Sequence, residues 1–401
     1  MNSSRPPHIL LCSAWQMINI GDVAHTPAML ALLERHFPEA RVTLWPHKPL
    51  TPAARALMLT RFPALNVVEG DITNAGKPSR PELARTLDEA DFLLHGSGPA
   101  MLDWAKAEAF SARTGRAFGV YGVTYGLYGI PEKATLSRAR FVYFRDSISL
   151  AAAKKDVVNA PVVEWSPDVA FAADLRDDAR AAAFLRANGL EDGQFLCCIS
   201  RLRNTPFWEH DENSAFDPEK HARNESMKAR DHAPLIEAIV AVTRQTATKV
   251  LICPEDASQM AVSRENILEK LPTDVRERVV WREDFWLPDE VLSVYRRSAG
   301  VFGHEMHSPI MAVGNGVPGL VCRWAEQSTK GLMWRDIGLG AWLFDFDNEE
   351  DLARLAPAVL ALAQDPQRAK IKAAAAREVV FARFAETMEV VNREVYAARH
   401  S

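Results

Sequence analysis

The chain has 401 residues, more than one hydrophobic core ordinarily serves, so we expect two domains. Apolar residues make up 48% of it and charged residues 25%, a balance typical of globular proteins and not of fibrous or disordered ones. The net charge is −5 with acidic and basic residues interspersed, which argues against a basic surface for nucleic acid.

The apolar segments are all short. The N-terminal run is too short for a secretory signal, and no stretch approaches the ~20 apolar residues of a membrane span, so we expect a cytoplasmic protein. Each cysteine lies within a short apolar run and none has the paired spacing of a metal site. We therefore predict five reduced core residues: Cys12, Cys197, Cys198, Cys253 and Cys322.

The first ~170 residues alternate strand-like and helix-like segments, which indicates βαβ units around a parallel sheet. The predicted strands are 8–14, 41–45, 65–69, 91–95 and 117–122. The predicted helices between them are 26–37, 53–62, 81–89 and 101–114. Because the strands are continuously apolar, we expect a sheet covered on both faces.

A second series of the same kind begins near residue 180. Its predicted strands are 195–200, 249–253, 279–281, 300–302, 319–322 and 341–344, and its predicted helices are 233–245, 264–271, 289–297, 309–315 and 349–363. These patterns predict an α/β protein with two Rossmann-like domains facing across a cleft, with ligands at the carboxyl ends of the strands. The predicted bounds are 1–172, 180–385, and a last helix, 386–401, that packs back on the first domain.

Residues 204–232 are predicted to form one long irregular polar insertion. Loops of this length are usually functional lids or disordered segments. The insertion contains His210, His221 and His232, but their spacing fits no known metal site, so a solvated loop is the favoured interpretation.

Two glycine turns follow strands in the first half. In the segment 19–22, Gly21 would let the backbone approach a ligand, while Asn19 and Asp22 offer polar groups; Thr26-Pro27 is interpreted as the helix start. A plain turn is the alternative. The second turn, Gly96-Ser97-Gly98, is expected to present bare amides to an anion or a sugar, although such turns are also common without function.

The most informative turn is Glu305-Met306-His307-Ser308-Pro309, which follows strand 300–302. Ser308 is interpreted as an N-cap with proline at the first helical position, so His307 would stand at a helix N-terminus where amides attract a phosphate or carboxylate. There the imidazole could shuttle a proton near neutral pH. A structural histidine is the alternative.

Basic side chains near the predicted strand ends are candidates for binding the same anion. They are Arg145, Arg201, Arg203 and Lys330. Any one of them taken alone is more often part of a surface ion pair than a ligand.

In its order of motifs the chain resembles the polysaccharide pyruvyl transferase family. The matching pieces are NIGD at 19–22, ADFLLHGSGP at 90–99, FVYFRDSIS at 141–149, SPDVAF at 166–171, and VFGHEMHSPIMAVGNGVPGLVCRW at 301–324 with Lys330 and DIGL at 336–339. The resemblance spans roughly residues 8–340, and the ordered series is more specific than any one piece.

The resemblance implies a GT-B-like fold and a transferase that uses phosphoenolpyruvate as donor and a saccharide, including a lipid-linked one, as acceptor. It implies that His307 is an acid/base or donor-binding residue and that Arg145 contacts the donor. With Asp22 as a second catalytic residue, the predicted substrate-binding set is Asn19, Gly21, Gly96, Ser97, Gly98, Arg145, Arg201, Arg203, Glu305, Ser308 and Lys330. No metal or cofactor is expected, and no nucleic-acid partner; a lipid-linked acceptor would bring the protein to a membrane surface.

Glu305 departs from the family, which usually has arginine at this position. A carboxylate disfavours an anionic donor unless a cation compensates, and Arg201, Arg203 and Arg323 are the candidates. Two alternatives to pyruvyl transfer therefore stay open. One is a GT-B glycosyltransferase that uses a nucleotide sugar, and the other is an inactive sugar-binding or scaffold homologue.

Overall fold

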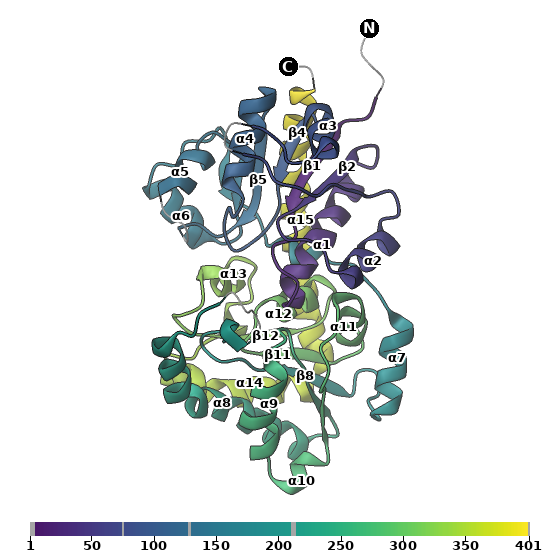
Figure 1. Cartoon of the computed structure of the whole chain (residues 1–401). Helices are drawn as coiled ribbons and strands as arrows, with labels where there is room; N and C mark the ends of the chain where they lie inside the picture. The colour runs from purple at the N-terminus through teal and green to yellow at the C-terminus, as the bar shows by residue number, and fades with distance from the viewer. Residues whose placement is uncertain (1–4, 74–75, 127–129, 210–213, 400–401) are drawn as a thin grey trace. The chain divides into compact units, whose positions relative to one another are not determined.

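The computed structural model describes residues 5–73, 76–126, 130–209 and 214–399 (Figure 1). These residues form two compact units. The N-terminal unit comprises 1–17, 22–174 and 379–401, and the C-terminal unit comprises 18–21 and 175–378.

The N-terminal unit contains a seven-stranded parallel sheet in the order β3-β2-β1-β4-β5-β6-β7. Its strands are β1 (His8–Ser13), β2 (Arg41–Pro46), β3 (Asn66–Val67), β4 (Phe92–His95), β5 (Phe118–Val123), β6 (Val142–Phe144) and β7 (Val163–Trp165). Its helices are α1 (Ile20–His36), α2 (Pro52–Arg61), α3 (Pro81–Glu89), α4 (Trp104–Thr114), α5 (Ile130–Leu136) and α6 (Ser147–Lys155), with a short 3-10 helix at Val169–Ala172. The central strands are buried along their whole length, as the apolar runs predict.

The C-terminal unit contains a six-stranded parallel sheet in the order β10-β9-β8-β11-β12-β13. Its strands are β8 (Phe195–Ile199), β9 (Lys249–Ile252), β10 (Val279–Trp281), β11 (Gly300–Gly303), β12 (Gly319–Arg323) and β13 (Leu343–Asp345). Two parallel sheets with crossover helices confirm the predicted fold class of two Rossmann-like domains.

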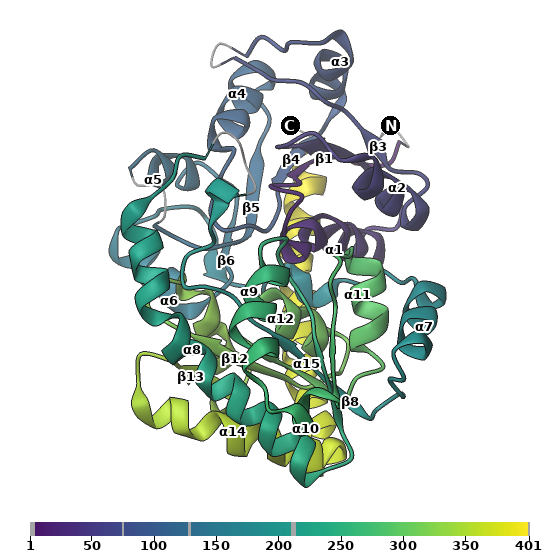
Figure 2. The same cartoon turned by 60° about the horizontal axis from the view of Figure 1, so that its bottom comes forward.

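Helices surround this second sheet. They are α7 (Asp178–Ala187), α8 (Pro218–Gln245), α9 (Gln259–Asn266), α10 (Thr273–Arg276), α11 (Pro288–Tyr295), α12 (His307–Gly314), α13 (Met333–Asp336) and α14 (Glu349–Gln364), with 3-10 turns at Phe207–Glu209, Leu268–Lys270, Thr329–Leu332 and Gly340–Trp342. Helices α8 and α14 pack side by side (Figure 2). Their buried apolar faces join the strands in one core.

The last helix, α15 (Pro366–Ala398), is continuous and contributes to both units. From Val379 onward it belongs to the N-terminal unit, where the hydroxyl of Thr387 lies 2.6 Å from that of Tyr121. The sequence-based bounds placed this return at 386 and the first boundary at 172–180. The structural bound within the last helix is at 379 and not at 386. The helix is continuous, so the bound depends on which unit each residue contacts and not on a break in the sequence pattern. Among the described residues, no helix is both long and apolar enough to cross a membrane.

The predicted irregular insertion at 204–232 is wrong over its second half. Helix α8 begins at Pro218, capped by Asp217, whose side chain accepts from the amide of Lys220. His221 lies in this helix and His232 is buried in it, while His210 falls outside the described residues. The polar composition was misleading because the first turns of α8 expose charged side chains.

The predicted start of the first helix is also wrong. Helix α1 begins at Ile20, so Pro27 lies inside it, and the hydroxyl of Thr26 bonds that of Ser13 instead of capping the helix. Strands β6 and β7 were not predicted because each is only three residues long. All five cysteines are free and buried, as predicted.

Candidate functional site

The centre of the site in the C-terminal unit is a pair formed by Glu255 and His307. Glu255 follows β9, and His307 begins α12 directly after β11, so both lie at carboxyl ends of parallel strands. The Nδ1 atom of His307 is 3.1 Å from Oε1 of Glu255, and both residues are buried. A carboxylate paired with an imidazole nitrogen is the arrangement that orients a histidine for proton transfer.

Lys330 contacts both nitrogens of the same ring. It lies in the 3-10 turn Thr329–Leu332 after β12, and its Nζ is 2.9 Å from Nε2 and 3.4 Å from Nδ1 of His307. The sequence predicted that Lys330 would reach a donor anion at this place. In the structure its ammonium contacts the imidazole ring of His307.

The segment 18–21 packs against this pair within the C-terminal unit. The amide of Ile20 donates to the carbonyl of Glu255 (2.9 Å), and Asn19 donates from Nδ2 to its carboxylate (3.4 Å). A Cβ on Gly21 would lie 1.9 Å from Cγ of His307. Because Gly21 has no side chain, the ring of His307 can pack against its backbone. The sequence had predicted a ligand at this place.

The N-terminus of α12 differs from the prediction. The helix begins at His307, so Ser308 is not its N-cap. The amide and the hydroxyl of Ser308 both donate to Oε2 of Glu255, each at 2.6 Å. The anion at this helix N-terminus is thus the protein's own carboxylate, which is stabilised there by the amide and the helix dipole.

Glu305 lies beside the pair and is compensated by Arg201. Its Oε1 is 3.3 Å from Nη1 of Arg201 and accepts from Nε2 of Gln259 at 2.6 Å. Burial raises the pKa of Glu305 to about 7; Arg201 opposes this shift, and the nearby Glu255 carboxyl adds to it. Glu305 can therefore change its charge near neutral pH.

A small pocket opens beside these groups. Its volume is about 220 Å³, and it lies wholly within the C-terminal unit. The lining residues are Arg201, Glu305, Met306, Glu326, Gln327, Ser328, Lys330 and Gly331. Two cations face two carboxyl groups there, so protonation of Glu305 would give the pocket a net attraction for anions.

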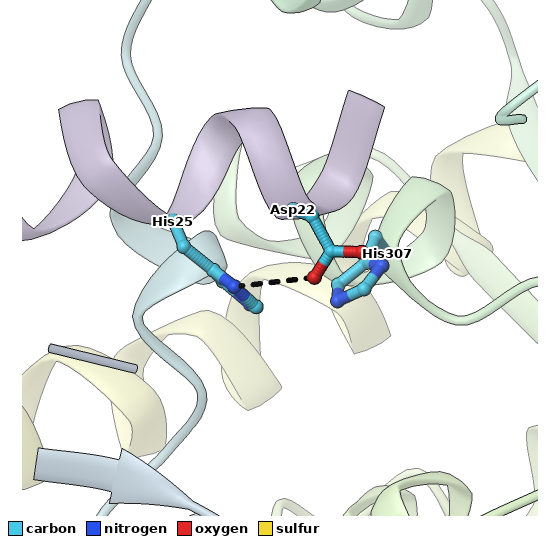
Figure 3. Close-up of side chains that lie close together, drawn as sticks. All are labelled: Asp22, His25 and His307. Atoms are coloured by element: carbon cyan, nitrogen blue, oxygen red, sulfur yellow. Dashed lines mark ion pairs between the residues drawn. The ribbon is translucent and has the colours of Figure 1, made fainter. Parts of the chain in front are cut away.

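Two other predicted residues, Asp22 and Arg145, lie in the N-terminal unit, where they belong to a buried polar chain. Arg145 is 2% exposed and pairs through Nη1 with Asp168 (2.9 Å). Asp168 also lies 3.1 Å from Nε2 of His25, whose Nδ1 is 3.8 Å from Asp22. Figure 3 shows the pair of Asp22 and His25 on α1, drawn together with His307. Asp22 of NIGD, Arg145 of RD and Asp168 of SPD are thus linked through side chains. The donor contact predicted for Arg145 stays a prediction.

In the turn Gly96-Ser97-Gly98, the amides of Gly96 and Gly98 are not bare, contrary to the prediction. The amide of Gly96 donates to the carbonyl of Cys12 and that of Gly98 to the carbonyl of Gly122. The hydroxyl of Ser97 also donates to Gly122 (2.7 Å). A Cβ on Gly98 would lie 2.6 Å from Nε1 of Trp15, so this glycine makes room for an indole.

Arg203 was predicted to bind substrate, but three carboxylates surround its buried guanidinium. It pairs with Asp231 at 2.8 Å, with Asp347 at 2.7 Å and with Glu326 at 3.0 Å. It therefore anchors α8, which carries Asp231. Arg323, another candidate to compensate Glu305, pairs with Asp345 instead.

Sequence reasoning missed Glu255 and His25. Glu255 stands two residues past the last apolar residue of its strand run, in Cys253-Pro254-Glu255, at the carboxyl end of a parallel strand. The same rule that selected His307 would have selected it. His25 carries no such signal, because it lies inside the apolar stretch of α1.

Solved structures with similar folds bind sugar nucleotides. Anabaena Alr3699/HepE in complex with UDP-glucose has a TM-score of 0.57 at 13% identity, covering 97% of this chain and 98% of its own. The UDP-GlcNAc 2-epimerase from Neisseria meningitidis bound to UDP-GlcNAc has a TM-score of 0.57 at 9% identity, covering 96% and 100%. Medicago truncatula UGT71G1 complexed with UDP-glucose has a TM-score of 0.56 at 10% identity, covering 98% of each chain. Identities this low support the GT-B-like fold and nothing more specific.

The sequence comparison is more specific. No curated protein matches the chain. The sequence profile described as Polysaccharide pyruvyl transferase matches residues 19–326, which include residues 19–21, Glu255 and the whole turn at 305–309. The chain belongs to the polysaccharide pyruvyl transferase family and is a transferase.

Proposed function

We propose that the protein transfers the pyruvyl group of phosphoenolpyruvate to a saccharide as a cyclic ketal. Two sugar hydroxyl oxygens form bonds to C2 of the donor while its C2–O bond to phosphate breaks. Of the two hydroxyl protons, one is in net terms transferred to C3, which becomes a methyl group. The other leaves with inorganic phosphate. The acceptor is a glycan or a lipid-linked saccharide.

The single observation that carries this proposal is the pocket beside His307. Its volume of about 220 Å³ is below the ~300–1,000 Å³ of pockets for drug-sized ligands, and a nucleotide sugar is at least that large. Phosphoenolpyruvate is much smaller and carries a carboxylate and a phosphate. Arg201 and Lys330 supply two cations that match these two anionic groups.

His307 supports the same reaction as its acid and base. Forming each C–O bond removes a proton from a hydroxyl, and C3 must gain one. An imidazole exchanges protons near neutral pH, and this one is backed by Glu255. We assign the proton transfers to His307 and the binding of the donor to Arg201 and Lys330; Asp22 stays a predicted second catalytic residue.

A thermal-shift screen tests the donor. At a hundredfold excess over its dissociation constant, a ligand that binds only the folded protein adds about 2.7 kcal/mol of stability. We expect phosphoenolpyruvate to raise the melting temperature, and UDP-glucose and UDP-GlcNAc to leave it unchanged. A shift with the sugar nucleotides alone would replace the proposal by a glycosyltransferase, and no shift with any of them would favour an inactive homologue.

Glu305 should make donor binding depend on pH. Above a pKa of about 7 its carboxylate is ionised and repels the donor; below that pKa it is neutral. We therefore expect the affinity for phosphoenolpyruvate to rise roughly tenfold as the pH falls from about 8 to about 6.5.

In Glu305→Gln this pH dependence should vanish, with high affinity at both pH values, as calorimetry would measure. The control is Glu219→Gln, on the exposed first turn of α8, which should titrate like the wild type. Equal pH dependence in Glu305→Gln and the wild type would show that Glu305 does not face the donor.

A further inference from the structure

The Glu255 carboxylate is saturated with hydrogen bonds, although it is fully buried. It accepts at one oxygen from the amide and the hydroxyl of Ser308, and at the other from Nδ1 of His307 and Nδ2 of Asn19. Its own amide donates to Oε1 of Gln259. A buried carboxylate is stable only with such donors, and here they come from two segments of the chain, at residue 19 and at residues 307–308.

The contact with Glu255 defines the tautomer of His307. Oε1 of Glu255 lies 3.1 Å from Nδ1, and a carboxylate only accepts, so Nδ1–H donates to Glu255. The neutral ring then has its hydrogen on Nδ1 and a lone pair on Nε2. The ammonium of Lys330, 2.9 Å from Nε2 and 3.4 Å from Nδ1, can only donate, which is compatible with a lone pair on Nε2.

The alternative tautomer is disfavoured at Nδ1. With its hydrogen on Nε2, the ring would turn a bare Nδ1 lone pair toward the carboxylate of Glu255. Gly21 packs so closely on the ring that a Cβ there would lie 1.9 Å from Cγ, so the ring cannot shift toward this side to escape. The ring is therefore held in one orientation.

We propose that Glu255 is the positioning residue of the transferase: it keeps the hydrogen of His307 on Nδ1, so that Nε2 presents the lone pair that takes a proton from the acceptor hydroxyl. This inference rests on the proposed function for the identity of the substrate. As the hydroxyl oxygen forms its bond to C2, its proton moves to Nε2, and the carboxylate of Glu255 stabilises the resulting imidazolium. Lys330 lies 2.9 Å from Nε2, so it must move for the acceptor hydroxyl to reach this nitrogen.

The test separates tautomer control from stability. In Glu255→Gln, the amide can offer either an oxygen or an NH₂ group to Nδ1, so the tautomer is no longer enforced. A comparable carboxylate-to-amide change in a serine protease triad lowers turnover about 10⁴-fold through the wrong tautomer. We expect kcat to fall about 10²–10⁴-fold, the KM for phosphoenolpyruvate to stay within about threefold, and Glu255→Asp to recover part of the activity.

Nitrogen NMR of isotopically labelled, ligand-free protein gives the decisive readout, with the His307 signals assigned from His307→Asn. The wild type should show a protonated Nδ1 and an unprotonated Nε2; Glu255→Gln should show a mixture or the reverse. Ser308→Ala, which loses a hydrogen bond to the same carboxylate, is the control and should keep the wild-type tautomer even where it lowers the melting temperature.

An unchanged tautomer in Glu255→Gln would overturn the proposal and leave Glu255 as a cap for α12. Because the NMR measurement needs no substrate, it stands whether or not phosphoenolpyruvate is the donor. A failure of the proposed function would appear instead in the thermal-shift screen.

Discussion

Replacing Arg203 by methionine is expected to lower the free energy of unfolding by about 3–5 kcal/mol. The side chain is 1% exposed and lies among three carboxylates, one of which, Asp231, is buried with it. Methionine preserves much of the volume but leaves Asp231 with only the longer ion pair to Arg230, at 3.6 Å, for its charge. Denaturant unfolding of the purified protein measures the loss.

Arg223→Met is the matched control, because Arg223 pairs with Glu326, one of the same carboxylates, at 2.7 Å but is 46% exposed. An exposed pair of this kind contributes about 0–1 kcal/mol. If Arg203→Met instead kept its stability and lost affinity for phosphoenolpyruvate, Arg203 would be a donor ligand, as the sequence alone had indicated.

Replacing His307 should abolish transfer while the fold persists. Loss of an acid/base group typically costs about 10²–10⁴ in rate, and we expect this fall in kcat for His307→Ala. His307→Asn is the sharper variant, because its amide can still donate to Glu255 in place of Nδ1 but has nothing in place of Nε2. We expect it to melt close to the wild type and to be as inactive as His307→Ala.

The assay is acceptor-dependent release of phosphate from phosphoenolpyruvate, with circular dichroism to check the fold. Near-normal turnover in His307→Asn would show that the proton passes through another group. Loss of turnover together with a lost fold would identify His307 as a structural residue of α12.

Most strands were predictable because a buried parallel strand is a short apolar run, and such a run is visible in the sequence. The strand at Val279–Trp281 has the predicted bounds, and β1 and β9 end one residue early. Helix starts were harder. They depend on which side chain meets a distant partner, as when Thr26 bonds Ser13 and not the backbone of its own helix.

The site was predictable only in part, for the same reason. His307 and Lys330 follow two neighbouring strands, so their proximity could be inferred from the sequence. The role of Glu255 could not, because it depends on contacts with residues 52 and 53 positions away. Arg203 looked like Arg201 in the sequence, and only the burial of Asp231 beside it separates a structural cation from one that lines the pocket.

The central claim is that this protein consumes phosphoenolpyruvate at the pocket beside His307. Phosphorus NMR tests it most directly, by following phosphoenolpyruvate and UDP-glucose together in one sample with a panel of oligosaccharides. With the wild type, the phosphoenolpyruvate signal should decline and inorganic phosphate should appear only when an acceptor is present, while UDP-glucose persists; with His307→Asn neither should change. Loss of UDP-glucose with phosphoenolpyruvate intact would contradict the account.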